Sequence, residues 1–267
     1  MILNGQPIQS FSTIQNKGIE LALGWFNLRN KNWTWQSTLT FTHNREKIQQ
    51  QSGEAIQPWK IGHPTRTYYG YKILGVWSSE EAQIAAKYQA RPGFLKYADT
   101  NGDSLINAAD RVVLGDNNPD VWGILQQVIT FKNWELSALL YARIGQTVPN
   151  RLYQFNSTND YNVANWITAR YWTPTRQEGV IYGQPNLNDL GSISSHQLQD
   201  GSFVKLRSIA LAYCTKSSRL KISLMAYNPI LLTRFKVTDP EFFDAYENVQ
   251  VTNLSERGLV LGVQASF

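Results

Sequence analysis

The sequence predicts an all-β fold, made of antiparallel strands that form part of a transmembrane β-barrel with long extracellular loops. Three observations predict it. Apolar and polar side chains alternate with a period of two in several segments of about ten residues. These segments are joined alternately by short polar turns and by long stretches. Hydrophobic residues make up 42% of the 267 residues and charged residues only 17%, which argues against a disordered chain.

The alternation is clearest near the N-terminus. Residues 32–42 place their large apolar side chains on one predicted face: Trp33, Trp35, Leu39 and Phe41. Threonines and a glutamine occupy the other face. The preceding run, Gly18–Leu28, has the same period, and the polar residues 29–31 between the two runs are typical of a tight turn. The two runs are therefore predicted to pair as an antiparallel hairpin.

The same pattern returns after the middle of the chain. The remaining predicted strands are residues 122–131, 134–144, 203–213, 220–228 and 258–267. The first four of these form two further hairpins around short polar turns. The chain thus supplies about seven or eight strands of roughly ten residues each, the length that a tilted strand needs to cross a bilayer. Strands of soluble proteins are shorter, at about five to six residues.

Long stretches separate the hairpins, at residues 47–120, 146–202 and 229–257. Short turns at one end and long connections at the other are the pattern of a transmembrane barrel. We expect residues 47–120 to form an extracellular loop region with a short helix that Ser78 or Ser79 caps. Aromatic residues near strand ends are expected at the membrane interfaces: Trp33, Trp35, Trp122, Trp134, Tyr213 and Tyr227. A soluble β-sandwich with long loops is the alternative, since alternation alone does not separate the two.

Charge and composition narrow the function classes. The net charge is +5, but Lys and Arg are scattered without a basic tract, which disfavours nucleic-acid binding. The lone cysteine, Cys214, excludes an internal disulfide framework. No run of about 18 apolar residues predicts a transmembrane helix. Residues 1–17 lack the charged start and apolar stretch of a secretory signal peptide.

The sharpest local motif is the twelve-residue stretch Asp99–Asp110. Oxygen-bearing side chains stand at its positions 1, 3, 5, 9 and 12, which is the spacing of an EF-hand calcium loop. The predicted metal ligands are Asp99, Asn101, Asp103, the carbonyl of Leu105, and Asp110. Glycine stands at position 4, and Ser104 occupies position 6, where such loops usually have glycine. A turn rich in Asp and Asn that binds no metal is the alternative. The predicted cofactor is therefore a structural calcium ion.

The sequence carries no catalytic constellation. The three histidines are far apart, and neither a nucleophile elbow nor a phosphate-binding glycine motif occurs. Asp239 and Glu241 form a candidate glycosidase pair only if their carboxylates face each other across a cleft, which sequence spacing does not establish. We therefore predict that the protein is not an enzyme and has no catalytic residues.

Several stretches together resemble the C-terminal barrel portion of SusC/RagA-type TonB-linked outer-membrane proteins of the Bacteroidetes, within the TonB-dependent receptor superfamily. The resemblance extends in order over nearly the whole chain. It rests on residues 17–20, 33–35, 41–48, 61–64, 69–72, 75–77, 80–82, 92–99, 113–115, 118–119, 171–174, 200–207, 228–229 and 239–241, and on the terminal Phe267.

The resemblance implies an outer-membrane importer of glycans or peptides. It implies a SusD-like surface lipoprotein that covers the barrel, and the TonB complex, which acts through an N-terminal plug domain. We expect this chain to be a fragment of the barrel wall, in contact with outer-membrane lipid, without plug, TonB box or signal peptide. The aromatic residues predicted to stack on substrate are Trp59, Tyr68, Tyr69, Trp166, Tyr171 and Trp172. A soluble, secreted, calcium-binding β-sandwich that binds carbohydrate is the alternative function.

Overall fold

The structure is a computed structural model that describes residues 2–3, 6–7, 12–51, 60–150, 172–180, 193–215, 219–236, 239–242 and 256–265. The chain divides into two compact units. We call the first the sheet unit; it consists of Met1–Thr65, Asn118–Gln146 and Asp200–Phe267. We call the second the connection unit; it consists of Arg66–Asn117 and Thr147–Gln199.

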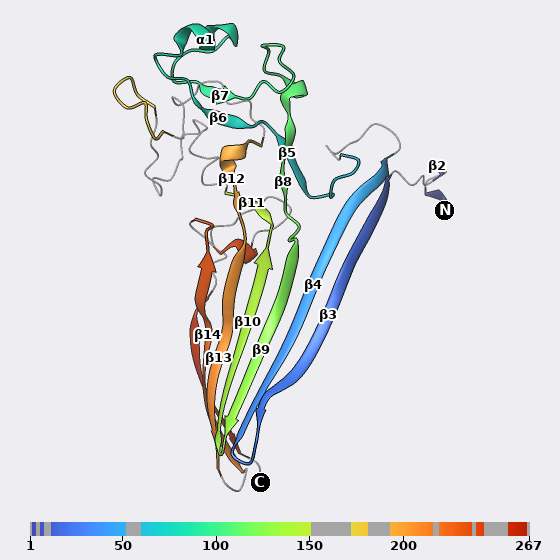
Figure 1. Ribbon diagram of the computed structural model, residues 1–267, viewed down its shortest axis with the longest axis vertical. Coiled ribbons are helices and arrows are strands. Elements are labelled where there is room, and N and C mark those ends of the chain that lie inside the picture. Colours follow the sequence, from blue (N-terminus) through green and yellow to red (C-terminus); the bar gives the residue numbers. More distant parts are fainter. Residues whose placement is uncertain are drawn as a thin grey trace. The chain divides into compact units, whose positions relative to one another are not determined.

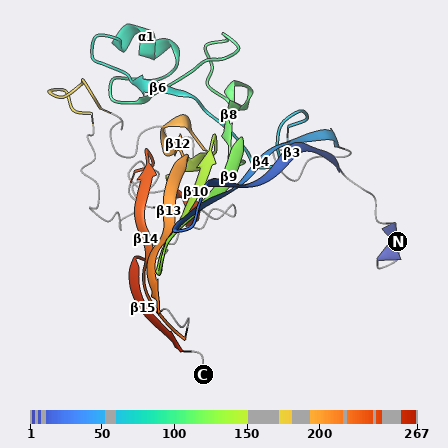
Figure 2. The same ribbon diagram turned by 60° about the horizontal axis from the view of Figure 1, so that its bottom comes forward.

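The sheet unit is built on one seven-stranded antiparallel sheet. Its strands are β3 (Ser12–Arg29), β4 (Trp33–Gln51), β9 (Val121–Phe131), β10 (Trp134–Ile144), β13 (Phe203–Cys214), β14 (Leu220–Thr233) and β15 (Gly258–Ala265). Each long strand pairs with the next long strand along the chain, from β3 at one edge (Figure 1) to β15 at the other (Figure 2). A separate two-stranded pair, β1 (Ile2–Leu3) and β2 (Gln6–Pro7), precedes them.

The three hairpins close at one end of this sheet (Figure 1), where residues 30–32, 132–133 and 215–219 connect their strands. In the first turn, Asn30 Oδ1 accepts hydrogen bonds from the backbone N–H groups of Asn32 and Trp33, at 3.0 and 2.9 Å. In the second turn, Lys132 adopts a positive φ of 53°, the left-handed conformation that tight hairpin turns require. The predicted alternation of short turns and long connections is therefore present in the structure.

The sheet has one apolar face that is open to the surroundings. Large exposed side chains on it include Leu21, Leu23, Leu211, Leu224 and Leu261, whose exposed fractions lie between 44% and 71%. A water-soluble protein would bury such a surface, because apolar area is costly to hydrate. All seven long strands belong to one sheet, and its edges β3 and β15 do not pair with each other. The predicted class of antiparallel strands in a partial barrel is confirmed, and Figure 2 shows the sheet from a second direction.

Aromatic side chains form a row across this apolar face next to the short turns. Trp33 pairs with Phe131, Phe131 with Trp134, and Trp134 with Tyr213 in the strand registers. The rings of Trp33 and Phe131 are 4.2 Å apart, and those of Trp134 and Tyr213 are 4.9 Å apart. Such a row is typical of a membrane interface.

Two residues expected in such rows lie on the opposite face. The prediction was wrong for Trp122, which pairs with Thr42 and Arg143 in the neighbouring strands. It was also wrong for Tyr227, which pairs with Ser208. Both belong to the alternate phase of the pleat from the aromatic row, because residues that pair directly across strands share a face.

Three two-stranded pairings and one short helix occur in the part of the connection unit that the structure describes. They are β5 (Thr67–Gly70) with β8 (Val112–Asp116), β6 (Ile73–Val76) with β7 (Leu95–Tyr97), β11 (Thr147–Pro149) with β12 (Leu198–Asp200), and α1 (Ala82–Lys87). Three 3₁₀ turns also occur in the described chain, at Ala108–Asp110, Ser195–Gln197 and Pro240–Phe242. The buried core of the unit is Tyr71, Leu95 and Tyr97, with Ile73, Val76 and Ile106 packed against it.

Glycine is required where two segments of this unit meet. A Cβ on Gly70 would lie only 1.9 Å from the carbonyl oxygen of Ile193. The next residue, Tyr71, accepts a backbone hydrogen bond from Ser195 at 3.0 Å and donates one to Ile193 at 3.1 Å. The missing side chain at Gly70 thus lets segments far apart in sequence approach closely enough to pair.

Helix α1 is shorter than predicted, and its N-cap residue is Glu81 instead of Ser78 or Ser79. The Ser78 backbone N–H donates to the Glu81 carboxylate at 3.2 Å, so the two residues interact in the reverse sense from the expected cap. No helix in the described ranges is long and apolar enough to cross a membrane.

Candidate functional site

The Asp/Asn loop, residues 99–110, is held by side chains that accept hydrogen bonds from its own backbone. Asp99 accepts from the N–H groups of Gly102 and Ser104, at 2.7 and 2.9 Å. Asn101 accepts from Asp103, and Asp103 accepts from Leu105. These contacts curl the chain tightly and leave most of the loop side chains exposed.

Asp110 closes the loop from inside. Its carboxylate is fully buried and accepts hydrogen bonds from the backbone N–H groups of Thr100 and Asn107, at 2.8 and 2.9 Å. Burial by itself would raise the pKa of Asp110, but the backbone donors from Asn107, Thr100 and Asn101 together outweigh it and lower the pKa below its ordinary value. The charged carboxylate is therefore the form that stabilises the loop.

The five predicted metal ligands thus lie on one loop, and its turn has a feature of a calcium loop. Ser104 has a φ of +63°, the left-handed conformation that the glycine at position 6 of an EF-hand loop supplies. Within the described ranges, no group of three or more His, Cys, Asp or Glu side chains is arranged to hold a metal ion. Calcium binding by Asp99, Asn101, Asp103, Leu105 and Asp110 stays a prediction.

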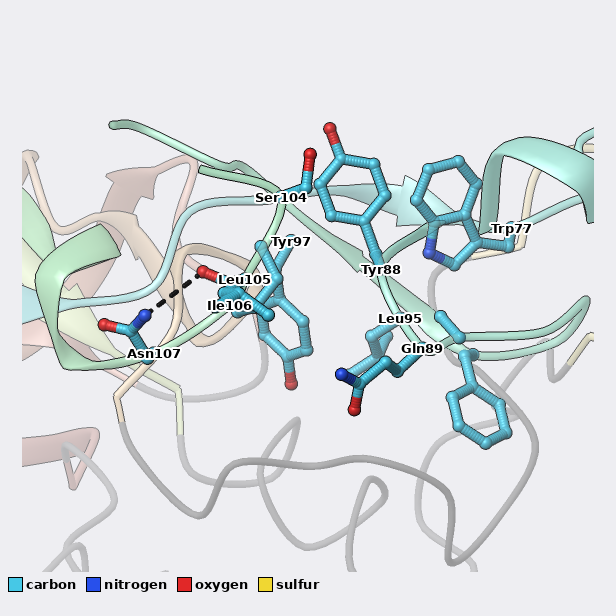
Figure 3. A pocket seen from close by; sticks show the side chains of 11 residues that line it. Trp77, Tyr88, Gln89, Leu95, Tyr97, Ser104, Leu105, Ile106 and Asn107 are labelled. Atoms are coloured by element: carbon cyan, nitrogen blue, oxygen red, sulfur yellow. Dashed lines mark hydrogen bonds between the residues drawn. The ribbon is translucent and has the colours of Figure 1, made fainter. Parts of the chain in front are cut away.

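A cavity of about 410 Å³ opens beside this loop (Figure 3). Its lining residues come from the chain on either side of α1, from β7, and from the loop itself: Trp77, Tyr88, Gln89, Ala90, Phe94, Leu95, Tyr97, Ser104, Leu105, Ile106 and Asn107. Trp77, Leu95 and Tyr97 are buried, whereas Gln89, Ser104, Leu105 and Asn107 are exposed at the mouth. The cavity therefore has an apolar, aromatic floor and a polar entrance, as small-molecule sites commonly do.

The aromatic floor is fixed by its neighbours. The rings of Trp77 and Tyr88 stack with centroids 5.8 Å apart, and Tyr97 meets Tyr71 edge to face at 5.6 Å. The Lys96 ammonium lies 4.4 Å from the Trp77 ring centroid and forms an ion pair with Glu81 at 2.5 Å. The hydrogen bond from Lys96 is the main cause that lowers the pKa of Glu81. These contacts hold the rings in place before any ligand enters.

None of the predicted substrate aromatics that the structure describes lines this cavity. Tyr68 and Tyr69 are half-buried in β5, where they pair with Gly115 and Val113 of β8. Trp172 is 5% exposed, too little to offer a ring face to a substrate. Trp59, Trp166 and Tyr171 lie outside the described residues. The aromatic lining residues Trp77, Tyr88 and Tyr97 were not predicted as ligand contacts.

A second polar cluster lies on the face of the sheet unit opposite the apolar face. The Lys205 ammonium is 1% exposed and forms ion pairs with Asp239 and, at 2.5 Å, with Glu241. Arg207 also pairs with Glu241. Both carboxylates of the candidate glycosidase pair are thus neutralised by cations, and this cluster anchors the turn Pro240–Phe242 to β13.

Comparison with known proteins places this architecture. No family model matches the chain. TonB-dependent receptor P26 of Formosa agariphila is 28% identical over 264 residues, which cover 88% of this chain and 26% of the relative. TonB-dependent receptor SusC of Bacteroides thetaiotaomicron is 21% identical over 267 residues, which cover 89% of this chain and 25% of the relative. The chain therefore spans about a quarter of the length of the curated relatives that it matches.

Solved structures give the same answer for the fold. The structure of the RagAB peptide transporter aligns with a TM-score of 0.76 and 21% identity, over 97% of this chain and 30% of that chain. The class defined by the fold is a set of antiparallel strands similar to those of a TonB-dependent receptor barrel. Within that class, the resemblance to the C-terminal barrel portion of SusC/RagA-type proteins is confirmed.

Proposed function

We propose that this chain forms part of the wall of an outer-membrane nutrient importer that depends on TonB. The observation that carries the proposal is the seven-stranded sheet in which each strand pairs with its neighbour in sequence and whose apolar face stays exposed. Such a face is stable in contact with lipid, where apolar side chains need no burial. The similarity to TonB-dependent receptors over most of the chain supports the same role.

The cargo of this importer is a glycan or a peptide. One solved relative is a peptide transporter by its own description. In this proposal, the long connections of the chain, including residues 47–120, form the extracellular substrate chamber. Its partners are a SusD-like surface lipoprotein that closes the chamber and the TonB complex, which acts through a plug domain. In this proposal the candidate glycosidase carboxylates Asp239 and Glu241 have a structural role, since both form ion pairs with Lys205.

A structural calcium ion is a second element of the proposal. The oxygen-rich loop 99–110 forms one wall of the aromatic cavity through its residues 104–107. A cation held by Asp99, Asn101 and Asp103 would rigidify that wall, because one ion would tie three residues of the loop together. Its role would be structural, since the oxygen ligands that fill its coordination shell leave no open position for catalysis.

Fractionation of native cells tests the import proposal. An immunoblot with an antibody against residues 60–117 is expected to detect a protein that stays in the outer membrane after a high-salt wash and that only detergent extracts. A mass well above the 30.4 kDa of this chain is expected if the wall belongs to a larger importer. A soluble species of about that mass would overturn the proposal and favour a secreted carbohydrate-binding protein instead.

A further inference from the structure

The apolar face of the sheet unit ends in a group of cations, at the end away from the hairpin turns. The ladder of β4 with β9 stops at His43, whereas the ladder of β4 with β3 continues to Gln51, so β3 and β4 extend past β9 (Figure 1). Lys17 and Arg45 pair directly in this extension, and Lys47 follows on β4. We call these three residues the cation cluster.

The cation cluster projects from the same face as the apolar side chains. An even number of residues separates Lys17 from Leu21 along β3. The same holds for Arg45 and Phe41 along β4. Leu21 and Phe41 pair with each other, and no register shift lies between that pair and the cations. Because alternate residues of a strand share a face, the cations continue the apolar surface.

The position of the cation cluster along the strands corresponds to a membrane surface. The aromatic row that includes Trp33 marks one membrane interface. A tilted strand crosses the hydrocarbon core in about 9–11 residues, and a count of about ten residues along β4 from Trp33 reaches His43. Arg45 and Lys47 follow directly, at the level of lipid headgroups. This is the end of the long connections, which is the outer side in transmembrane barrels.

The positive charge of the cation cluster is not balanced by acids of the chain. All three side chains are exposed, and within the described ranges none of them forms an ion pair. Glu20, which pairs with Thr42, belongs to the opposite face. So does Glu46, whose carboxylate accepts a hydrogen bond from the Thr65 N–H at 2.7 Å. The ligand that complements this surface is therefore an anion.

A groove of about 290 Å³ lies on the same face beside Phe41. Gly123 and Ala142 pair directly and form a low floor, because neither has a large side chain. Phe41 pairs with Gly123 and forms one wall. Val204 pairs with Ala142 and forms the other. The remaining lining side chains of this face are Leu39, Val121, Leu125, Leu140 and Ile144. On this face the lining is entirely apolar, which suits a hydrocarbon chain.

The groove and the cation cluster together match the dimensions of one lipid molecule. Val121, at the near edge of the groove, pairs with His43, which directly precedes the cations of β4 on this face. Leu39, at the far edge, is about 20 Å from Arg45 along the strand, at about 3.4 Å per residue. A tilt of about 45° converts this length into about 14 Å of depth, close to one leaflet of a hydrocarbon core about 30 Å thick.

We propose that this surface binds one anionic lipid of the outer leaflet, with its phosphate on Lys17, Arg45 and Lys47 and one acyl chain in the groove. The Arg45 guanidinium forms paired hydrogen bonds with phosphate oxygens, and the two lysine ammonium groups add charge. The inference rests on the proposed import function, since only a chain in the outer membrane meets this lipid. It concerns the wall of the importer and is independent of the cargo.

Lipid binding to the protein extracted from the outer membrane tests the proposal. The protein in dodecyl maltoside micelles is titrated with dioleoyl-phosphatidylglycerol and, separately, with zwitterionic dioleoyl-phosphatidylcholine, and native mass spectrometry measures the lipid that stays bound. The anionic lipid is expected to bind more tightly. Lys17→Gln, Arg45→Gln and Lys47→Gln are each expected to weaken its binding about fivefold, the contribution of one basic residue at an anionic membrane surface.

Lys221→Gln is the matched control, because the Lys221 side chain is 39% exposed but lies on the opposite face of the same sheet. It is expected to leave lipid binding unchanged. Ala142→Leu fills the groove and keeps the cations. It is expected to weaken binding of the dioleoyl lipid about fourfold for each methylene that the groove no longer covers, and to affect dihexanoyl-phosphatidylglycerol less. Unfolding followed by tryptophan fluorescence verifies that each variant folds.

Three results would overturn the lipid proposal. They are equal binding of the two dioleoyl lipids, equal binding of phosphatidylglycerol in wild type and Arg45→Gln, and complete displacement of the lipid by inorganic phosphate, which would show that the cations select a free anion. A protein partner on this surface would give the second result. Each result is compatible with a protein that only detergent extracts from the outer membrane, so failure of the lipid site is distinguishable from failure of the import proposal.

Discussion

The indole Nε1 of Trp35 donates a hydrogen bond of 2.7 Å to Oε1 of Gln127 on the neighbouring strand. The same oxygen accepts from the Ser37 hydroxyl at 2.8 Å. Asn27 on β3 donates to Ser37 and accepts from Trp25 at 2.8 Å. These polar groups lie on the face that is otherwise apolar. They form hydrogen bonds with one another, as polar groups withdrawn from water must.

Gln127→Leu should therefore destabilise the sheet although it makes the face more apolar. The substitution leaves the Trp35 indole and the Ser37 hydroxyl without their acceptor, which predicts a loss of about 1–3 kcal/mol in the free energy of unfolding. Denaturant unfolding in detergent micelles measures it. Gln126→Leu is the control, since Gln126 points to the opposite face and has no side-chain hydrogen bond among the described residues. Equal losses in the two variants would contradict the argument.

The buried and exposed ion pairs of the sheet unit should differ in their effect on stability. Lys205→Met leaves the nearly buried carboxylates of Asp239 and Glu241 without the Lys205 ammonium. It is expected to lower the free energy of unfolding by about 3–5 kcal/mol. Lys221→Met breaks an ion pair with Glu135 in which both side chains are more than a third exposed, and is expected to cost less than about 1 kcal/mol. Unfolding curves of the two variants give the comparison. A larger loss for Lys221→Met than for Lys205→Met would show that the cluster does not anchor the turn at Pro240.

Asp110 predicts a pH dependence for the loop. The pKa of Asp110 is lower in the folded chain than in the unfolded chain, where it is about 3.9. The ionised carboxylate therefore stabilises the folded loop above this unfolded pKa, and the stabilisation is lost as pH falls through the lower pKa of the folded chain. Asp110→Asn should lower the stability of the loop by about 1–3 kcal/mol near neutral pH, and by progressively less below about pH 4. Backbone hydrogen exchange at Thr100 and Asn107 between pH 7 and pH 3 measures the effect.

Asp103→Asn is the control for this experiment, because Asp103 is exposed and an amide oxygen can still accept from the Leu105 N–H. It should change exchange at Thr100 and Asn107 little. If Asp110→Asn and wild type exchange alike at neutral pH, the carboxylate does not hold the loop.

Stabilisation of the fold by calcium should depend on the side chain of Asp99 and not on that of Ser104. If the loop binds calcium, a concentration ten times the dissociation constant stabilises the fold by about 1.4 kcal/mol. Asp99→Ala should abolish this gain, whereas Ser104→Gly should keep it, because glycine suits the sharp turn of a calcium loop. Thermal unfolding in calcium, in magnesium and in chelator makes the comparison. Identical curves in calcium and chelator for the wild-type chain would exclude the metal.

The strands could be predicted because each carries its own signal. The prediction gave β9 and β10 to within one residue, since residues 132–133 mark the turn between them and one face of β10 is apolar throughout. The ends of β3 and β4 were underestimated, because the ladder continues through polar pairs such as Asn16 with Glu46, where the apolar alternation has already stopped. Hydrogen bonds between backbones need no apolar face, so hydrophobicity alone does not mark where a strand ends.

Strand β14 illustrates another limit. The prediction ended this strand at Asn228, directly before Pro229, but the strand continues to Thr233. The register shifts between Leu206 and Ser208 on the partner strand, opposite this point. A bulge tolerates proline because the residue there need not donate to the ladder.

The cavity could not be predicted from sequence. Its lining comes from a helix end, a short strand and a loop, and the aromatic residues Trp77, Tyr88 and Tyr97 have no periodic spacing. Only the three-dimensional fold of the connection unit brings them together. One local signal was available: Ser104 at the glycine position of the loop marks a side chain retained against the preference of the backbone.

The order of the strands has a consequence for how such proteins diversify. Each hairpin of the sheet consists of two strands that follow each other closely in sequence, so the pairing within one hairpin does not depend on the length of the connection to the next. The connections at the other end only need to return the chain to the next hairpin, and doubling the length of a flexible loop costs only about 0.6 kcal/mol. New segments can thus be inserted between β4 and β9, or between β10 and β13, without re-registering any strand. Evolution can change the long connections of this scaffold while the wall keeps its pairing.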